Sequence, residues 1–374
     1  MVHSRAREIL LTLYKHQHAL RYQNEVKNLA RQNRSLSIRP SSSYATRIDS
    51  FWKKYYGKSV NKFCHAVCAS VNGIEDERYI PREIWNLEIL PYLNRLALHD
   101  AYADKNAIDI FLEDFQAPIT IFKKMNGIYY LSKNQPISRN TALKYLLEHG
   151  GTVIIKPSFS ADGKNVKALY IQDNQIFVGD KPIPFERLDD AYGNDYIIQE
   201  KIVQHPIMHE IYPNSVNTLR MVTFRLKSKI YPLFTFARFG NRGGVVDNIG
   251  AGGLGCRINE DGNLNKYAID KLGYKYERHP YSNYSFEEGR IPNINAYSDY
   301  VITLHHQLPY FDIVSWDIAI GLQAEPILIE LNLVGDSTFY QMVSGPLFGS
   351  FTEELLEKIR DSPYRPSWHI KWKL

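Results

Sequence analysis

Two hydrophobic runs that carry acidic and amide side chains constrain most strongly what this chain can fold into. Residues 314–320 and 327–333 are rich in β-branched and aromatic side chains, and residues 321–326 between them have the composition of a turn. Such a pair predicts a β-hairpin. If Ile320 pairs with Ile327, Asp317 lies directly opposite Glu330. Asn332 then lies on the same face, because side chains alternate along a strand.

This arrangement predicts a cluster of oxygen ligands. Directly opposed residues have Cβ atoms about 4.5–5.5 Å apart, and two carboxylates at that distance repel each other and need a cation. Oxygen ligands such as Asp317, Glu330 and Asn332 suit Mg²⁺ held together with phosphates and waters, and do not suit zinc. The alternative is a solvated polar face of the sheet. Because the rest of both strands is apolar, we favour the metal site.

A lysine at the end of a buried strand predicts a second part of the site. Residues 153–155 are apolar, and Lys156 follows them directly before Pro157. A lysine in such a place needs an anion. The segment that follows is small and polar, with Ser158, Ser160, Gly163 and Lys164. Its backbone N–H groups could bind phosphate, although it lacks the residues of a Walker A loop. Taken alone, the segment fits a hairpin turn better.

Composition places the chain among ordinary folded proteins. Its 374 residues suffice for two to three domains, and 44% of them are hydrophobic and 23% charged. This excludes a disordered tail, a collagen and a coiled-coil rod. No apolar run approaches the roughly 18 residues of a spanning helix, and three cysteines cannot build a disulfide framework. We therefore expect a soluble protein of the cytoplasm.

The positive charge is concentrated at the N-terminus. Residues 1–60 hold 12 lysines and arginines against three acids, whereas the whole chain has a net charge of +5. Residues 3–32 lack proline and glycine and predict one amphipathic helix. Such a basic segment could meet an anionic membrane surface, an acidic polysaccharide or a nucleic acid. The simplest interpretation, which we favour, is a solvated helix face.

The remaining patterns predict an order of elements. Helical patterns cover residues 50–70, 81–97 with an interruption near Pro91, and 104–115. Short strands then alternate with turns from Pro118 to residue 199, around one helix at 139–149. Strands at 218–225 and 230–238, helices at 297–307 and 351–361, and a C-terminal strap follow. The predicted divisions are a helical region with a basic arm (1–95), two lobes (96–200 and 201–361) and the strap (362–374).

Two further motifs fit structural roles. Residues 250–255 match a glycine-rich dinucleotide pattern, but a strand and a turn follow where that motif requires a helix, so we reject a Rossmann site. Cys64 and Cys68 lie one helical turn apart without a second pair of ligands nearby. They predict a buried reduced pair and not a zinc site.

Several short motifs occur in one order along residues 50–350. They are the segment 51–57, Asp104-Lys105-Asn106, Ile155-Lys156-Pro157, the segment 198–202, Asn217-Thr218-Leu219-Arg220, Val246-Asp247-Asn248 with Gly252-Gly253, Trp316-Asp317, and Glu330-Leu331-Asn332. In this order they resemble the ATP-grasp superfamily, and within it the sugar-transfer-associated ATP-grasp family of polysaccharide gene clusters. The resemblance implies an α+β ATP-grasp fold, two α+β lobes that clasp ATP, preceded by a helical region.

The resemblance also implies roles for individual residues. Lys105 and Lys156 are similar to the lysines that reach the ATP phosphates, and Arg220 to the arginine that meets the γ-phosphate or an acylphosphate. Residues 158–164, with Ser158, Ser160, Gly163 and Lys164, correspond to the phosphate lid. The strand that reads adenine corresponds to Gln199, Glu200, Lys201 and Ile202, with Glu200 accepting from the amino group. The Mg²⁺ ligands correspond to Asp317, Glu330 and Asn332, and the acceptor-facing residues to Arg238, Asp247 and Asn248.

The activity implied by the resemblance is that of a Mg²⁺- and ATP-dependent carboxylate–amine ligase that works through an acylphosphate. Its implied partners are ATP, a carboxylate and an amine, in the attachment of an amino acid or amine to a saccharide carboxylate during bacterial surface polysaccharide biosynthesis. The basic arm would touch the inner face of an anionic membrane, and no nucleic acid is expected. The alternatives are a kinase on the same fold and a non-catalytic, nucleotide-binding scaffold of a polysaccharide assembly complex.

Overall fold

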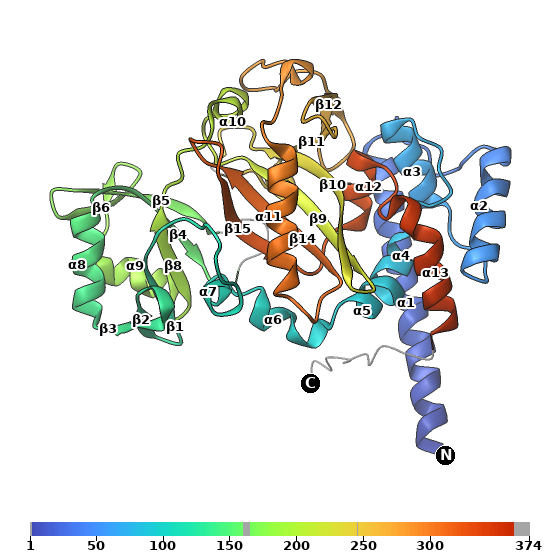
Figure 1. The fold of residues 1–374 in the computed structure, drawn as a ribbon, viewed down its shortest axis with the longest axis horizontal. Helices are drawn as coiled ribbons and strands as arrows, with labels where there is room; N and C mark the ends of the chain where they lie inside the picture. The colour runs from blue at the N-terminus through green and yellow to red at the C-terminus, as the bar shows by residue number, and fades with distance from the viewer. Residues whose placement is uncertain (1, 160–164, 245, 363–374) are drawn as a thin grey trace.

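The structure is a computed structural model that describes residues 2–159, 165–244 and 246–362, with side chains from Thr12 onward. Three parts follow one another across Figure 1. A smaller lobe is built on an eight-stranded sheet, a larger lobe on a seven-stranded sheet, and a group of N-terminal helices lies on the far side of the larger lobe. The larger lobe therefore stands between the other two parts.

The N-terminal region is helical, as predicted. Its elements are α1 (Val2–Gln32), α2 (Ser42–Tyr55), α3 (Phe63–Asn72), α4 (Arg82–Ile84), a π-helical turn (Trp85–Ile89) and α5 (Leu90–Leu93). The mainly helical region predicted at residues 50–70 is formed by the end of α2 and by α3, and the chain turns between them at Gly57 with a φ of 87°. The interruption predicted near Pro91 lies at Asn94, where the backbone is extended. Pro91 lies in the first turn of α5, directly after the π-helical turn, where a missing N–H is tolerated.

The N-terminal helices share one hydrophobic core with the larger lobe. Trp52 and Val67 are fully buried in the same cluster as Phe224 of the central sheet and Met342 near the C-terminus. Burial of this kind stabilises by about 25 cal/mol per Å² of apolar surface. The helices are therefore part of the same packed body as the larger lobe. The division of the chain into residues 1–95, 96–200, 201–361 and 362–374 stays a prediction.

The smaller lobe has a core of its own. Its antiparallel sheet has the order β3-β2-β1-β8-β4-β5-β6-β7, and its cluster of buried residues is drawn only from residues 121–198. The predicted helix at 139–149 is confirmed as α8. The elements are β1 (Thr120–Met125), β2 (Ile128–Tyr130), β3 (Pro136–Ile137), α8 (Arg139–His149), β4 (Gly151–Pro157), β5 (Lys167–Gln172), β6 (Gln175–Val178), β7 (Lys181–Pro182), α9 (Phe185–Tyr192) and β8 (Tyr196–Glu200).

The larger lobe is an antiparallel sheet covered on both faces, in the order β13-β12-β11-β10-β9-β14-β15. Helix α11 packs on one face, and α12 with the N-terminal helices packs on the other. All eight residues of β14 are buried, which explains its continuous apolar run. The elements are α10 (Pro206–Ile211), β9 (Thr218–Leu226), β10 (Lys229–Phe239), β11 (Leu254–Ile258), β12 (Leu264–Ile269), β13 (Lys275–Tyr276), α11 (Ile294–His306), β14 (Ile313–Ile320), β15 (Pro326–Asn332), α12 (Ser337–Ser344) and α13 (Thr352–Asp361).

In the hairpin β14–β15, Asp317 pairs with Glu330 as predicted, but the pairs nearer the turn differ from the prediction. Ile320 pairs with Pro326 and not with Ile327, so the expected starting pair is wrong. The register shifts between Asp317 and Ile318, because Ile329 is an extra residue without a partner on β14. This bulge restores the opposition of Asp317 and Glu330.

Other expectations need correction. The helix expected at residues 104–115 is a single turn, α7 (Ile108–Phe111), preceded by α6 (His99–Tyr102). The carboxylate of Asp104 accepts from the backbone N–H of Asn106 at 2.9 Å and so forms a turn instead. In contrast, the prediction for the glycine-rich segment at 250–255 is confirmed, because it leads into the strand β11 and not into a helix. The strap, with Trp368 and Trp372, lies outside the described residues apart from Ser362.

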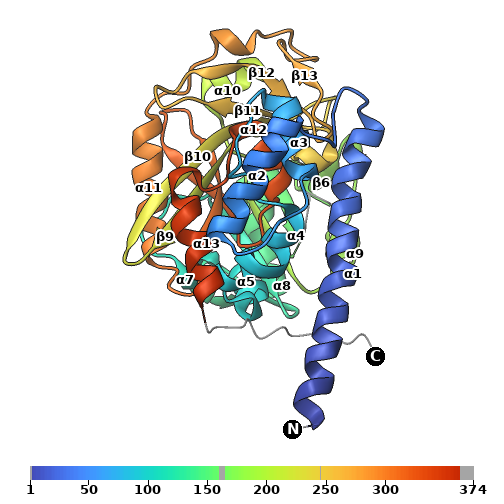
Figure 2. The same cartoon turned by 90° about the vertical axis from the view of Figure 1, so that its right-hand side faces the viewer.

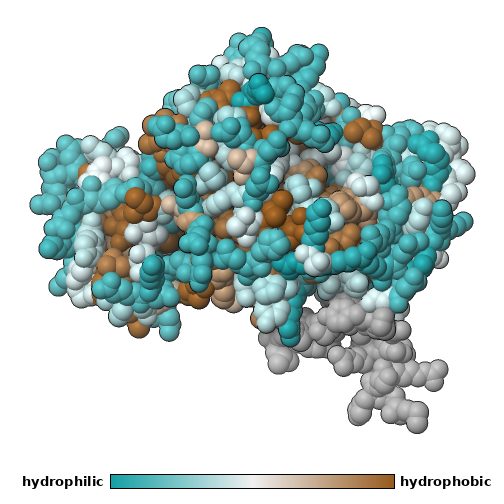
Figure 3. Space-filling view, in the orientation of Figure 1, coloured by the Kyte–Doolittle hydropathy of each residue, from teal (hydrophilic) through white to brown (hydrophobic). Residues whose placement is uncertain are grey.

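The surface fits a protein with a well-covered core. The face seen in Figure 3 is mainly hydrophilic, with hydrophobic residues in separate small patches. Among the helices of the described residues, none combines the length and the apolar character needed to cross a bilayer.

Candidate active site

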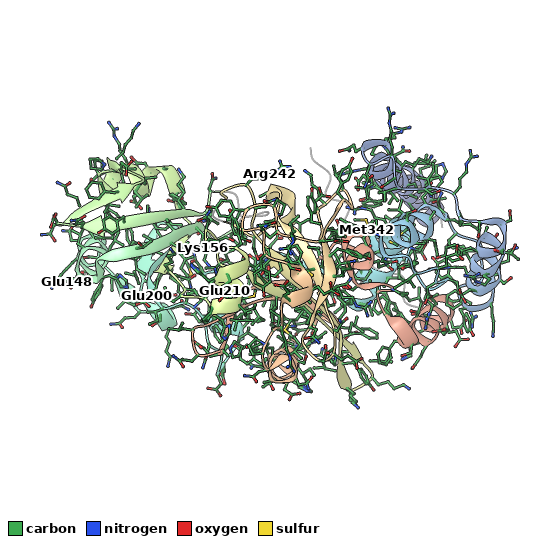
Figure 4. All side chains as sticks on the ribbon, turned by 90° about the horizontal axis from the view of Figure 1, so that it is seen from above. Glu148, Lys156, Glu200, Glu210, Arg242 and Met342 are labelled. Carbon is green, nitrogen blue, oxygen red and sulfur yellow. The ribbon has the colours of Figure 1, made fainter. Side chains whose placement is uncertain are left out.

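The sequence-predicted residues converge where the two lobes meet. Figure 4 shows Lys156 at this junction. A cleft of about 150 Å³ lies there between β4 and β8 of the smaller lobe and the central sheet of the larger lobe. Residues from both lobes line it, including Lys105, Lys156, Gln199, Glu200, Ile202, Arg238, Asp247, Asn248, Asp317 and Glu330. Residues more than 200 positions apart in the sequence therefore form one site.

Asp317 is the centre of the charged network. Its side chain is fully buried on β14 and accepts from two guanidinium groups. Arg220 on β9 donates through Nη2 at 3.0 Å, and Arg238 on β10 donates through its own Nη2 at 2.9 Å. Burial alone would raise the pKa of Asp317, but the two arginines outweigh it and hold the pKa below its usual range. Asp317 is therefore a carboxylate at neutral pH.

The network extends along β9 and β10. Arg238 also donates to Thr218 Oγ1 at 2.9 Å and lies 3.3 Å from Asp247 Oδ1. Burial, with the nearby charge of Asp317, raises the pKa of Asp247, which Arg238 opposes. Asn248 accepts from the backbone N–H of Gly250 at 2.6 Å, so its side chain stabilises its own loop. Arg238 is thus shared between two carboxylates of the site.

The sequence analysis gave no role to two residues of this network. Thr218 contacts Arg238, and the hydroxyl of Tyr340 on α12 accepts from Nη1 of Arg220. Helix α12 was not predicted, although Asp336 before it caps its N-terminus by accepting from Thr338 N at 2.9 Å. The Asp-Ser-Thr sequence in front of an apolar stretch was the available signal.

The two lysines and Glu330 line the same cleft. Lys105 Nζ is 3.2 Å from Glu330 Oε2. Lys156 is 8% exposed and forms no ion pair with a described residue. Burial and the charge of Lys105, opposed by the charge of Glu330, together lower the pKa of Lys156 to about 8. An anion in the cleft would therefore stabilise the charged form of Lys156.

The loop after β4 contributes less than expected within the described residues. The hydroxyl of Ser158 is buried and donates to the carboxylate of Asp104, and its carbonyl accepts from Lys105 N at 3.3 Å. These bonds fix Lys105 next to the end of β4. Ser160, Gly163 and Lys164 lie outside the described residues. The role of Ser158 as a nucleotide ligand stays a prediction. In this structure its hydroxyl bonds to Asp104, the residue directly before Lys105.

The end of the cleft predicted to bind adenine has one buried acceptor without a partner among the described residues. Gln199 donates through Nε2 to Pro118 O at 3.3 Å and to Thr120 Oγ1 at 3.2 Å, while its buried Oε1 has no partner among the described residues. Glu200 accepts from His149 Nε2 at 3.0 Å. Gln199 Oε1 is thus better placed than Glu200 to accept from an amino group. Lys201 is exposed, and Ile202 lines the apolar wall.

The donor set at the acidic hairpin fits Mg²⁺. Asp317 and Glu330 are opposed, and Asn332 Nδ2 lies 3.4 Å from Asp317 Oδ2. Within the described ranges no cluster of three His, Cys, Asp or Glu residues exists, so an ion here would take two carboxylates and an amide. Such ligands suit Mg²⁺, which completes its shell with waters and phosphates. Both oxygens of Asp317 already accept from arginines, so the ion would share that carboxylate with them.

Comparison with known families shows where the chain belongs. The family model described as "Sugar-transfer associated ATP-grasp" matches residues 92–355, which is well over half of the chain. The chain belongs to the sugar-transfer-associated ATP-grasp family. Its fold is the ATP-grasp fold, as predicted, preceded by the helical region that the family model leaves uncovered. No curated protein matches the sequence.

Solved structures with a related fold include three enzymes. D-Alanyl-alanine synthetase A from Vibrio cholerae is 11% identical, with a TM-score of 0.38 over 70% of this chain and 64% of its own. D-Alanine–D-alanine ligase from Helicobacter pylori is 14% identical, with a TM-score of 0.40 over 73% and 62%. The biotin carboxylase domain of 2-oxoglutarate carboxylase from Hydrogenobacter thermophilus is 11% identical, with a TM-score of 0.42 over 88% and 60%. The chain thus spans less than two thirds of each of these structures.

Proposed function

We propose that this ATP-grasp protein is a Mg²⁺- and ATP-dependent carboxylate–amine ligase. The observation that carries the proposal is the meeting of Lys105, Lys156 and Arg238 with the acidic hairpin in one cleft between the lobes, with Arg220 paired to Asp317 at its border. ATP lies in that cleft with its adenine at Gln199 and its phosphates at the lysines. Asp317, Glu330 and Asn332 would hold Mg²⁺, which when bound would supply positive charge at the phosphates.

The reaction we propose has two steps. A carboxylate oxygen attacks the γ-phosphorus of ATP, the bond to the bridging oxygen breaks, and ADP leaves. The amine nitrogen then attacks the acyl carbon, phosphate leaves, and the proton of the amine passes to solvent. Phosphoryl transfer depends on positioning and charge neutralisation more than on a protein nucleophile. Lys156 and Arg220 carry the catalytic charge, because both are buried where water screens them little.

The acceptor side of the site is a weaker part of the proposal. Arg238, Asp247 and Asn248 line the nucleotide cleft, and we place the approach of the substrate carboxylate on their side. The saccharide rests on the family description alone. A kinase on the same fold would release ADP with a stable phosphorylated product, whereas the ligase releases ADP and phosphate with a new amide.

Nucleotide binding tests the proposal and depends on pH. Because the pKa of Lys156 is about 8, its charge is present at pH 7 and mostly lost at pH 9. We expect the affinity for Mg²⁺ and the analogue AMP-PNP to fall about tenfold between these pH values, measured by isothermal titration calorimetry. The fall should vanish in Lys156→Arg, which stays charged throughout. No binding of AMP-PNP at pH 7, or an equal fall in Lys156→Arg, would contradict the proposed site.

We also propose that α1 makes the peripheral membrane contact. Its first half extends beyond the body in Figure 2, and Leu13 and Leu20 on it are 62% and 47% exposed. Deletion of residues 1–18 should reduce cosedimentation with phosphatidylglycerol vesicles and leave AMP-PNP binding unchanged, with phosphatidylcholine vesicles as the uncharged control. A longer deletion would remove Val26, which is buried in the core. Equal sedimentation of the shortened chain would rule out this contact.

A further inference from the structure

A second, larger cleft borders the first. Its volume is about 870 Å³, and it shares Lys105, Arg238, Asn248 and Glu330 with the nucleotide cleft. From these residues it runs along α12 toward α1. Ligand sites in proteins commonly have about 300–1,000 Å³, so this cleft has room for much more than a single amino acid. In Figure 4, Met342, which lines it, lies on the side of the larger lobe away from Lys156.

The far wall of this cleft comes from outside the family match. Glu25, Leu29 and Gln32 line it, and their spacing of four and three residues places them on one face of α1. The family model begins only at residue 92. The helical region therefore completes a cleft that the ATP-grasp body forms only in part.

Specific bonds hold this wall in place at both ends. Arg82 lies 3.0 Å from Glu25 Oε2 and donates to Asp336 Oδ1 at 2.9 Å, which ties α1 to the start of α12. At the other end, Asn33 donates to Leu272 O at 3.1 Å, and the hydroxyl of Tyr274 donates to Gln32 O at 3.0 Å. The helix is thus anchored to the larger lobe on both sides of the cleft.

Most of the cations that line the cleft are paired with carboxylates. Arg82 pairs with Glu25 and Asp336, Lys105 with Glu330, and both Arg220 and Arg238 with the buried Asp317. Lys271, in contrast, forms no ion pair with a described residue, and it is exposed next to the exposed Gln32 at the α1 end. A cation and an amide at that end favour an elongated ligand that carries a second negative charge and hydrogen-bonding groups far from the nucleotide cleft.

We propose that this cleft binds an acidic oligosaccharide of two or more sugar rings, with α1 as the wall that selects its length. The proposal rests on the ligase function proposed above and extends it to the size and charge of the acid substrate. The reacting carboxylate lies at Arg220 and Arg238, and the rest of the chain of uronic acid units extends to Lys271 and Gln32. An acidic peptide is the alternative occupant.

Binding of galacturonic acid and trigalacturonic acid tests this proposal. Isothermal titration calorimetry is carried out on the full chain saturated with Mg²⁺ and AMP-PNP. We expect the trimer to bind at least about tenfold more tightly than the monomer. Gln32→Trp, which fills the α1 end, and Lys271→Glu, which reverses its charge, should abolish this advantage. Asn24→Trp is the matched control, because Asn24 is exposed on α1 but does not line the cleft.

The outcomes separate the two proposals. Equal affinity for monomer and trimer, no binding of either sugar, or a full trimer advantage in Lys271→Glu would overturn the oligosaccharide site. Binding of triglutamate as tightly as of trigalacturonic acid would assign the cleft to a peptide. AMP-PNP affinity is measured in the same samples, and it should be the same in all of these variants. If AMP-PNP does not bind, that result contradicts the ligase function and leaves the proposal for the larger cleft standing.

Discussion

Replacing Asp317 by alanine is expected to lower the free energy of unfolding by about 3–5 kcal/mol. Asp317 is fully buried and is the shared acceptor of Arg220 and Arg238, which are themselves 9% and 6% exposed. Without it, two buried guanidinium groups lose their principal counter-charge. Urea denaturation followed by circular dichroism measures the effect. Loss of activity in this variant therefore does not by itself identify a metal ligand.

The matched control is an ion pair on the surface. Glu354 lies 3.2 Å from Lys227 Nζ and 3.0 Å from Lys358 Nζ, in contact with solvent. Glu354→Ala should unfold at nearly the same urea concentration as the native chain, because exposed pairs contribute little. An unfolding midpoint of Asp317→Ala equal to that of Glu354→Ala would show that the arginines do not depend on Asp317.

Replacing Glu330 by glutamine is expected to lower ATP turnover by about 100-fold or more and to leave the fold intact. The side chain of Glu330 is 29% exposed, and the isosteric amide oxygen can still accept a hydrogen bond from Lys105, whose own side chain is 8% exposed. Loss of one carboxylate from a Mg²⁺ site removes several kcal/mol of charge stabilisation, and each 1.36 kcal/mol is a factor of about ten in rate. Release of ADP measured against Mg²⁺ concentration is the assay.

Glu325 in the turn of the same hairpin provides the control. Its side chain accepts from Gln323 N at 2.8 Å and does not line the nucleotide cleft. Glu325→Gln should therefore keep the native turnover and Mg²⁺ dependence. If Glu330→Gln also keeps both, Glu330 is not a metal ligand and the acidic hairpin has another role.

Local sequence patterns were enough to predict the acidic hairpin. The apolar runs of β14 and β15 predicted the hairpin, and the pairing of Asp317 with Glu330 followed from it, although the register leading to it was wrong at Ile320. The bulge at Ile329 explains the difference, since one extra residue shifts every pair on the turn side. Hydrophobic periodicity cannot detect a single unpaired residue inside an apolar strand. The roles of the individual site residues remain predictions that the experiments above test.

Contacts between distant segments could not be predicted from the sequence patterns. The partners of Asp317 lie 97 and 79 residues away on β9 and β10, and nothing in the spacing indicated that both arginines would meet one carboxylate. Tyr340 escaped prediction because its helix was missed. The wall that α1 adds to the larger cleft depends on Arg82 and Leu272, which belong to different parts of the chain. Such contacts follow from tertiary packing and not from local propensity.

The hydrophobic core shared by the N-terminal helices and the central sheet has a mechanical consequence. The two walls of the larger cleft, α1 and the hairpin face, belong to one rigid block, whereas the smaller lobe has a separate core. We therefore expect any opening and closing to take place at the junction that contains Lys156. The distance between α1 and the hairpin would then stay fixed during that motion, so the cleft proposed for the acid substrate would measure the length of its ligand.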